Sequence, residues 1–205
     1  ATGADLLAIK NIDNVVMEPH RPAVVASRRL LVGLCAQLQH QAHALLRSGD
    51  DEAARSFARG WFGREGSGAA ELLDRPLRVV GVVANDGEPC GGPFWVEGPH
   101  GATPQIVEGA QLDRADPAQV ALWEDSTHFN PVDMVCALRG PGGEPYDLDR
   151  FVDPKGWMLS DKTRAGRPIR VLEHPGLWNG GMAGWNTVFV EVPRSTFNPV
   201  KTLAD

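Results

Sequence analysis

The 205-residue sequence has few cysteines, few lysines and no long apolar run, and each scarcity narrows the classes of protein that it can encode. Its three cysteines, Cys35, Cys90 and Cys136, are odd in number and far apart, which argues against a disulfide framework and gives no metal-binding spacing. No apolar stretch reaches the roughly 18 residues that a membrane-spanning helix needs. A net charge of −6 argues against nucleic acid or an anionic membrane as the main partner. We therefore expect a cytoplasmic protein with reduced thiols and no nucleic-acid or membrane partner.

The two ends of the sequence resemble cuts within a longer chain. There is no initiator methionine, and an apolar segment begins within a few residues of Ala1. At the other end, residues 201–205 stop where a helix could begin. The length suits one domain over residues 1–205, and 42% hydrophobic residues is enough to build a core.

Hydrophobic periodicity predicts strands alternating with helices. Strands are expected at residues 5–10, 77–83, 132–138 and 188–192, with a hairpin formed by 94–97 and 105–108. Helices are expected at 23–47, 50–59 and 117–124, a glycine-rich loop at 60–68, and an exposed excursion at 140–168. These elements predict the α/β class, with a mixed, mostly parallel sheet and flanking helices.

Two residues that follow predicted strands are candidates for phosphate chemistry. Asp13, beside Asn14 after the first strand, fits a turn or helix cap, or a ligand of Mg²⁺ shared with substrate phosphates. Lys201, one of four lysines, follows Pro199 after the last strand. A lysine there is either simply solvated or a fixed point charge for a phosphate.

Three further segments are candidates for ligand binding. Gly91 and Gly92 lie in a loop that either needs unusual backbone angles or brings the backbone close to a ligand. His128, between Thr127 and Asn130, is either a structural histidine or part of a sugar pocket. Asn179 lies in the segment 177–186, where two tryptophans and two asparagines alternate with glycines. That mixture suits a sugar site, although Trp185 can equally belong to the core.

These segments resemble motifs of the UTP-dependent sugar-1-phosphate uridylyltransferases, the UDP-sugar pyrophosphorylases. Residues 9–14 are similar to the strand and Asp-Asn doublet that bind the catalytic magnesium, and residues 197–202 to the Phe-x-Pro-Val-Lys-Thr turn whose lysine holds phosphate. Residues 105–108 resemble the Val-Val-Glu strand behind the sugar pocket, and 127–129 an Asn-His-Phe segment beside the sugar. The resemblance implies that Asp13 binds Mg²⁺ and acts in catalysis with Lys201. It implies a substrate-binding role for Asn14, Gly91, Gly92, Glu108, Thr127, His128, Asn130 and Asn179.

Along nearly its whole length the chain resembles more closely a bacterial family catalogued only as a domain of unknown function, number forty-three-oh-one. Residues 87–95 and 176–201 are the most distinctive parts of this match. The characterised pyrophosphorylases also grip the nucleotide with a glycine-rich loop that precedes the Asp-Asn strand, and no such segment is present here. The resemblance therefore implies the C-terminal half of a nucleotide-diphospho-sugar transferase-like fold, inactive without its N-terminal half. Its expected ligand is a sugar phosphate or nucleotide sugar.

Three functions remain open at this level. The first is a nucleotidyltransferase that acts on a sugar 1-phosphate with Mg²⁺. The second is a non-catalytic domain that binds a sugar nucleotide, for which Thr127 in place of the expected Asn is the sequence support. The third is a structural or interaction domain, which the exposed stretch 140–168 would serve.

Overall fold

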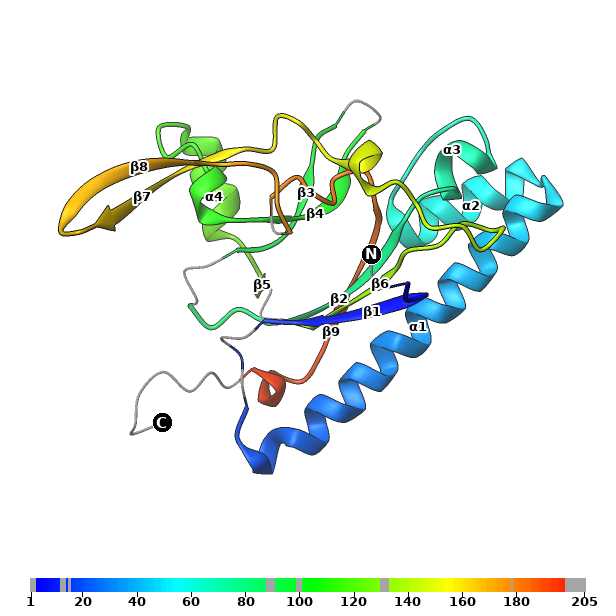
Figure 1. Ribbon diagram of the computed structural model, residues 1–205, viewed down its shortest axis with the longest axis horizontal. Helices are drawn as coiled ribbons and strands as arrows, with labels where there is room; N and C mark the ends of the chain where they lie inside the picture. Colours follow the sequence, from blue (N-terminus) through cyan, green and yellow to red (C-terminus); the bar gives the residue numbers. More distant parts are fainter. Residues whose placement is uncertain are drawn as a thin grey trace.

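A computed structural model describes residues 3–11, 14, 16–87, 91–98, 101–129, 133–177 and 179–197, and is built around one five-stranded sheet (Figure 1). Its strand order is β1 (Leu6–Lys10), β6 (Asp133–Ala137), β2 (Leu77–Ala84) and β5 (His128–Phe129), and β9 (Asn186–Glu191) pairs with β2. Among the described strands of this sheet, the β2–β9 pairing is parallel and the others are antiparallel. The α/β class is confirmed, but the prediction of a mostly parallel sheet is wrong. The physical reason is that β6 lies between β1 and β2 and runs antiparallel to both. The strands that precede and follow the longest helix in the sequence, β1 and β2, are therefore not neighbours in the sheet.

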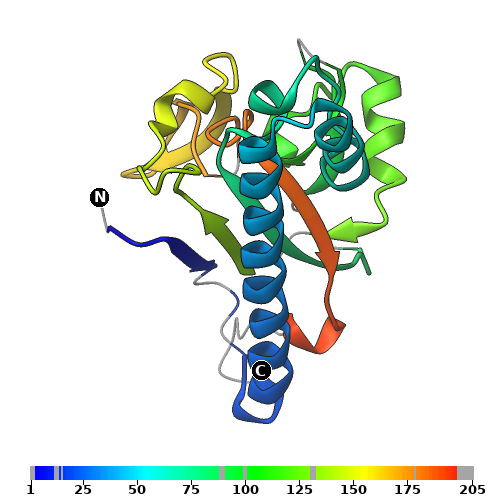
Figure 2. The same cartoon turned by 90° about the vertical axis from the view of Figure 1, so that its right-hand side faces the viewer.

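Helix α1 (Arg21–Ser48) covers one face of this sheet, as Figure 2 shows. Alternate residues of each strand face the helix, as the two-residue repeat of a strand requires. The side chains on this side form one buried cluster with α1, which includes Leu31, Cys35, Leu38, Val79, Val135 and Val188. Helices α2 (Asp51–Phe62) and α3 (Ala69–Leu73) extend the same cluster. The expected helices at 23–47 and 50–59 are confirmed, whereas α3 was not predicted.

A hairpin and a turn cover the opposite face. Strands β3 (Gly92–Val96) and β4 (Thr103–Val107) pair with each other, and residues 179–185 fold beside them. The buried side chains of this second cluster are Val80, Ile106, Met134, Cys136, Met182 and Trp185. The interpretation of Trp185 as a core residue is therefore confirmed.

Arg78 is buried within this second layer, with 2% of its surface exposed. Its Nε donates to Thr187 Oγ1 at 2.9 Å and its Nη2 to Gln105 Oε1 at 2.8 Å. Burial lowers the pKa of this guanidinium to about 10, because removal from water disfavours the charged form. The side chain thus joins β2 to β9 and to the hairpin through neutral partners.

Shorter elements and one projecting hairpin complete the chain. They are α4 (Pro117–Glu124), the 3-10 helices η1 (Glu18–His20), η2 (Gly109–Gln111), η3 (Leu148–Phe151) and η4 (Arg194–Thr196), and the strands β7 (Met158–Arg164) and β8 (Arg167–Glu173). The predicted excursion at 140–168 is largely exposed, but its last part pairs with β8 and projects from the body (Figure 1). Within the described residues, no helix combines the length and the apolar character needed to cross a bilayer.

Two glycine substitutions test how closely the hairpin packs on the sheet. A Cβ at Gly92 would lie 2.5 Å from the backbone oxygen of His128, whereas a Cβ at Gly33, within α1, would meet nothing within 4 Å. We expect Gly92→Ala to lower the free energy of unfolding by about 1–3 kcal/mol, as overpacking does. Gly33→Ala, the matched control, should raise it by about 0.5–1 kcal/mol because alanine favours the helix. Urea unfolding measures both, and a Gly92→Ala variant as stable as the wild type would contradict the packing.

The two described cysteines provide a second test of the fold. Cys35 and Cys136 are free and fully buried, on opposite faces of the sheet, and burial raises the pKa of each thiol to about 12. Because thiolate is the reactive form, neither should react with a thiol reagent at pH 8 in the native protein. Cys90 lies outside the described residues, so the assay uses Cys90→Ser. The expected result is no fast reaction in buffer and two reactive thiols per chain in denaturant; fast labelling in buffer would contradict the burial.

Candidate functional site

Strand direction gathers several polar side chains at one edge of the sheet, which we call the carboxyl edge. Strands β1, β2 and β9 all end there, and β6, which runs the opposite way, begins there. Lys10 is the last residue of β1 and Asp133 the first of β6, and the two lie directly opposite each other in the register. Directly opposed residues point to the same face, so this pair meets on the side that α1 covers.

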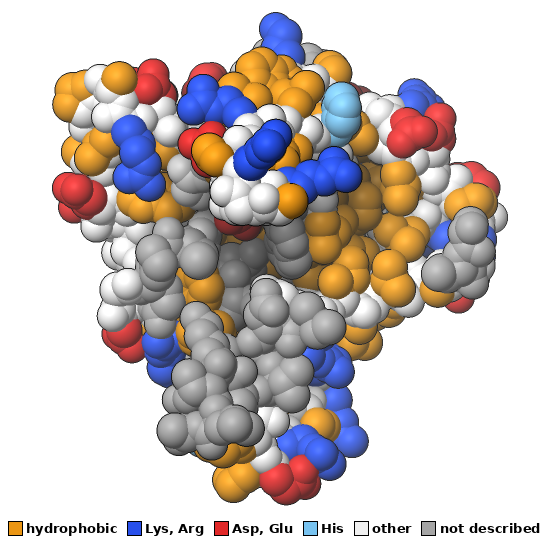
Figure 3. Space-filling view, turned by 60° about the vertical axis from the view of Figure 1, so that its left-hand side comes forward, with side chains coloured by type: hydrophobic (Ala, Val, Ile, Leu, Met, Phe, Trp, Pro, Cys, Tyr) orange, Lys and Arg blue, Asp and Glu red, His pale blue; other side chains and the backbone are white. Residues whose placement is uncertain are grey.

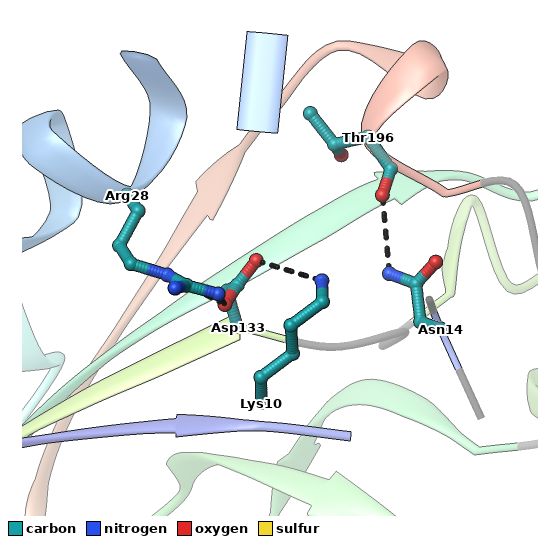
Figure 4. Close-up of polar contacts among 5 residues, drawn as sticks. All are labelled: Lys10, Asn14, Arg28, Asp133 and Thr196. Atoms are coloured by element: carbon teal, nitrogen blue, oxygen red, sulfur yellow. Dashed lines mark hydrogen bonds and ion pairs between the residues drawn. The ribbon is translucent and has the colours of Figure 1, made fainter. Parts of the chain in front are cut away.

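Asp133 is bound by two cations, as Figure 4 shows. Its Oδ1 accepts from Arg28 Nη2 at 2.7 Å and from Nε at 3.2 Å, and its Oδ2 accepts from Lys10 Nζ at 3.4 Å. The Asp133 side chain is 12% exposed, against 26% for Lys10 and 40% for Arg28. The three side chains together carry one net positive charge, with the cations on the solvent side. These three side chains by themselves attract an anion.

Asn14 connects two segments that are far apart in the sequence. Its side chain is buried, with 1% of the residue exposed, and Nδ2 donates to the backbone oxygen of Thr196 at 3.1 Å (Figure 4). This bond ties the segment after β1 to η4, which follows β9. Asp13 and Lys201, the predicted catalytic residues, lie outside the described residues. In the sequence, Asp13 directly precedes Asn14, and Lys201 follows Thr196 by five residues.

A second polar group lies on the opposite face of the same edge. Thr127 Oγ1 is 2.8 Å from His128 Nδ1, and His128 Nε2 is 3.2 Å from Glu191 Oε2. The side chains of the predicted site residues Thr127 and His128 are thus in contact. Glu191 is a third member of the group, which the sequence reasoning missed. Asn130, predicted beside them, lies outside the described residues.

Gly91, Gly92 and Glu108 lie at the base of the β3–β4 hairpin, where Gly92 packs against His128. Both glycines are buried, and a Cβ at Gly91 would lie 2.6 Å from the backbone oxygen of Val107 and 3.1 Å from Cδ of Glu108. Their lack of a side chain therefore serves close packing of protein against protein. Burial raises the pKa of the Glu108 carboxyl. A role for these three residues toward a ligand stays a prediction.

Asn179 is separated from the carboxyl edge, because it precedes the start of β9 at the opposite end of the strand. It is 5% exposed, and its Nδ2 donates to the backbone oxygens of Gly156 at 2.8 Å and His174 at 3.3 Å. Its Oδ1 accepts from the Gly176 backbone N–H at 3.2 Å. The amide thereby holds the turn together, at the end of β9 away from Asn14, Thr127 and His128.

An open groove of about 120 Å³ lies between the hairpin and α4. Its lining is largely apolar, and the rings of Phe94 and Trp123 stack there with centroids 5.4 Å apart. Figure 3 shows hydrophobic side chains gathered on one face of the molecule, beside a hollow with basic side chains above it. The described residues that line the groove include no charged side chain, and Asp13 and Lys201 lie outside the described residues.

Among the described residues, three carboxylates at the carboxyl edge are already engaged by basic groups. Asp133 is bound by Lys10 and Arg28, Glu191 contacts His128, and Asp86, just beyond β2, pairs with Arg194 Nε at 3.1 Å. Within the described part of the chain, no three acidic, histidine or cysteine side chains come together to hold a metal ion.

Sequence reasoning missed Arg28, Asp133 and Glu191 for a common reason. Arg28 lies on the polar flank of a long helix, Asp133 opens an apolar strand and Glu191 ends one, and charged residues are ordinary in all three positions. Their partners lie 105, 123 and 63 positions away in the sequence. No local motif marks such contacts, so only the strand register could have identified them.

Comparisons with known proteins place the chain in a family. No curated protein matches it. Two solved structures of mutant UDP-glucose pyrophosphorylase from Leishmania major, both in complex with UDP-glucose, are similar at 16% and 20% identity, each with a TM-score of 0.40. The matches cover 70% and 69% of this chain, which spans about a third of the length of those chains, 34% and 33%. Residues 64–205 match the model of a family described as Domain of unknown function (DUF4301), and the chain therefore belongs to that family.

Proposed function

We propose that this chain forms part of a nucleotidyltransferase-like protein that binds a sugar 1-phosphate or a nucleotide sugar with Mg²⁺. The observation that carries the proposal is the hydrogen bond from Asn14 to Thr196, across 182 positions of sequence. It supports a common location for the Asp-Asn doublet and the Pro-Val-Lys-Thr turn, the two motifs on which the resemblance to pyrophosphorylases chiefly rests.

Chain geometry limits how far the two predicted catalytic residues lie from this bond. Asp13 immediately precedes Asn14, so their Cα atoms are about 3.8 Å apart. Lys201 follows Thr196 by five residues, which span at most about 18 Å when fully extended. We propose that Asp13 and Lys201 contact the phosphates of one substrate near Asn14 and Thr196.

The charges of Lys10, Arg28 and Asp133 favour an anionic ligand beside this cluster. Lys10 and Arg28 outweigh the single carboxylate of Asp133, and both cations keep part of their side chains exposed. A phosphate group approaching the edge is attracted by this excess charge. Asp133 holds the two cations in position, because breaking either contact would leave a largely buried carboxylate with less compensation.

The proposed chemistry needs positioning and positive charge more than proton transfer. The phosphate oxygen of a sugar 1-phosphate would attack the α-phosphorus of a nucleoside triphosphate in line, and pyrophosphate would leave. That oxygen is already anionic, so no general base is required. Lys201 would offset the negative charge that develops on the transferred group. Asp13 would hold Mg²⁺ together with substrate phosphates, and the ion supplies further charge neutralisation.

A non-catalytic sugar-nucleotide-binding domain is the second candidate. Thr127 stands where the characterised enzymes have Asn, and its hydroxyl contacts His128. Such a domain would bind the ligand but release no pyrophosphate. A pyrophosphate-release assay on the intact protein separates the two candidates.

Asp13→Ala tests the metal site. Calorimetric titration of the wild-type chain with UDP-glucose should show binding that strengthens in Mg²⁺, and the variant should lose this Mg²⁺ dependence because the protein ligand of the ion is removed. The matched control is Asp149→Ala, which removes an exposed carboxylate from η3. Equal Mg²⁺ dependence in the wild type and in Asp13→Ala would exclude Asp13 as the ligand.

Lys201→Ala tests the cation of the last motif. We expect about a tenfold or greater loss of affinity for UTP, since a charge-assisted hydrogen bond to phosphate contributes roughly 1.5–3 kcal/mol. Lys155→Ala, at an exposed position, is the matched control and should bind as the wild type does. If Lys201→Ala also kept wild-type affinity at several salt concentrations, the lysine would not contact the phosphates.

A further inference from the structure

The Thr127, His128 and Glu191 group forms a continuous chain of hydrogen bonds across the end of β2. His128 pairs with Ala84 of β2 on one side of that strand, and Glu191 pairs with Val82 on the other. Paired residues share a face, and Val82 and Ala84 are two positions apart, so His128 and Glu191 both point away from α1. The imidazole and the carboxylate therefore meet over β2, at 3.2 Å.

The backbone of His128 is held firmly in place. Its carbonyl oxygen accepts from Ser126 Oγ at 3.0 Å, and Gly92 packs so closely against the same oxygen that a Cβ there would lie 2.5 Å away. The ring itself has a partner at each nitrogen. The histidine thus has one orientation, with its side chain 30% exposed.

The identity of the partners determines where the protons lie. An ionised carboxylate can only accept, so the proton of a neutral ring lies on Nε2 and is donated to Glu191. Nδ1 is then an acceptor, and the hydroxyl of Thr127 must donate to it. The donor capacity of Thr127 is consumed in this way, whereas its oxygen keeps lone pairs. Thr127 is exposed, so those lone pairs are open to a ligand.

We propose that Glu191 is a positioning residue which, through His128, fixes Thr127 Oγ1 as a hydrogen-bond acceptor for a hydroxyl group of the bound ligand. The inference rests on the proposed function, which supplies a ligand rich in hydroxyl groups, and it assigns this part of the site to the sugar portion. An asparagine at position 127 could both donate and accept. The threonine held by His128 accepts only, so this position selects for a hydroxyl donor.

The first measurement is the tautomer of His128, which does not depend on ligand. Long-range ¹H–¹⁵N spectra of the labelled chain, at a pH where the ring is neutral, should show the Nε2–H form. Glu191→Gln should reduce this preference, because an amide can donate as well as accept. Glu52→Gln, an exposed glutamate in α2, is the matched control and should leave the His128 signals unchanged. An Nδ1–H ring in the wild type would overturn the proposal.

The second measurement is calorimetric titration with UDP-glucose. Thr127→Val and Glu191→Gln should each weaken binding about three- to tenfold, the usual effect of one neutral hydrogen bond, while Thr127→Ser should bind as the wild type does. If the wild type itself does not bind UDP-glucose, the proposed function fails and this inference fails with it. If the wild type binds and Thr127→Val binds equally well, the inference alone is overturned.

Discussion

The position of β2 between an antiparallel and a parallel neighbour is the constraint on which the rest of this structure depends. Seven of the eight residues of β2 are buried, and it pairs with β6 on one side and β9 on the other. In that arrangement the carboxyl ends of β1, β2 and β9 lie at one edge of the sheet. Lys10, Asp133, His128 and Glu191 take their positions at that edge from the register of these strands.

The two faces of that edge carry different chemistry. On the side of α1, Asp133 gathers Lys10 and Arg28 into a group with net positive charge, which suits phosphate. On the other side, Glu191 and His128 direct a neutral hydroxyl, which suits a sugar. A sugar phosphate presents both kinds of group on one molecule, and β2 separates the two sets of side chains by the thickness of the sheet edge.

Local sequence patterns predicted most elements because their signals are short-range. The apolar run at 77–83 and the amphipathic repeat at 23–47 correspond to β2 and α1, and the residues of α4 were predicted as observed. The prediction of a mostly parallel sheet was wrong because direction and neighbour are not encoded in a strand's own pattern. β6 has the same apolar composition whether it runs parallel or antiparallel, and its placement depends on packing over the whole sheet.

The family, most helices and strands, and the motifs at the two ends of the chain could be recognised from the sequence, because these depend on residues close together in it. Tertiary structure alone decided which of the predicted site residues meet. It placed Asn14 against Thr196 and Thr127 against His128, and it separated Asn179 from both. It also introduced Asp133 and Glu191, since a contact across strands is fixed by register and not by local sequence.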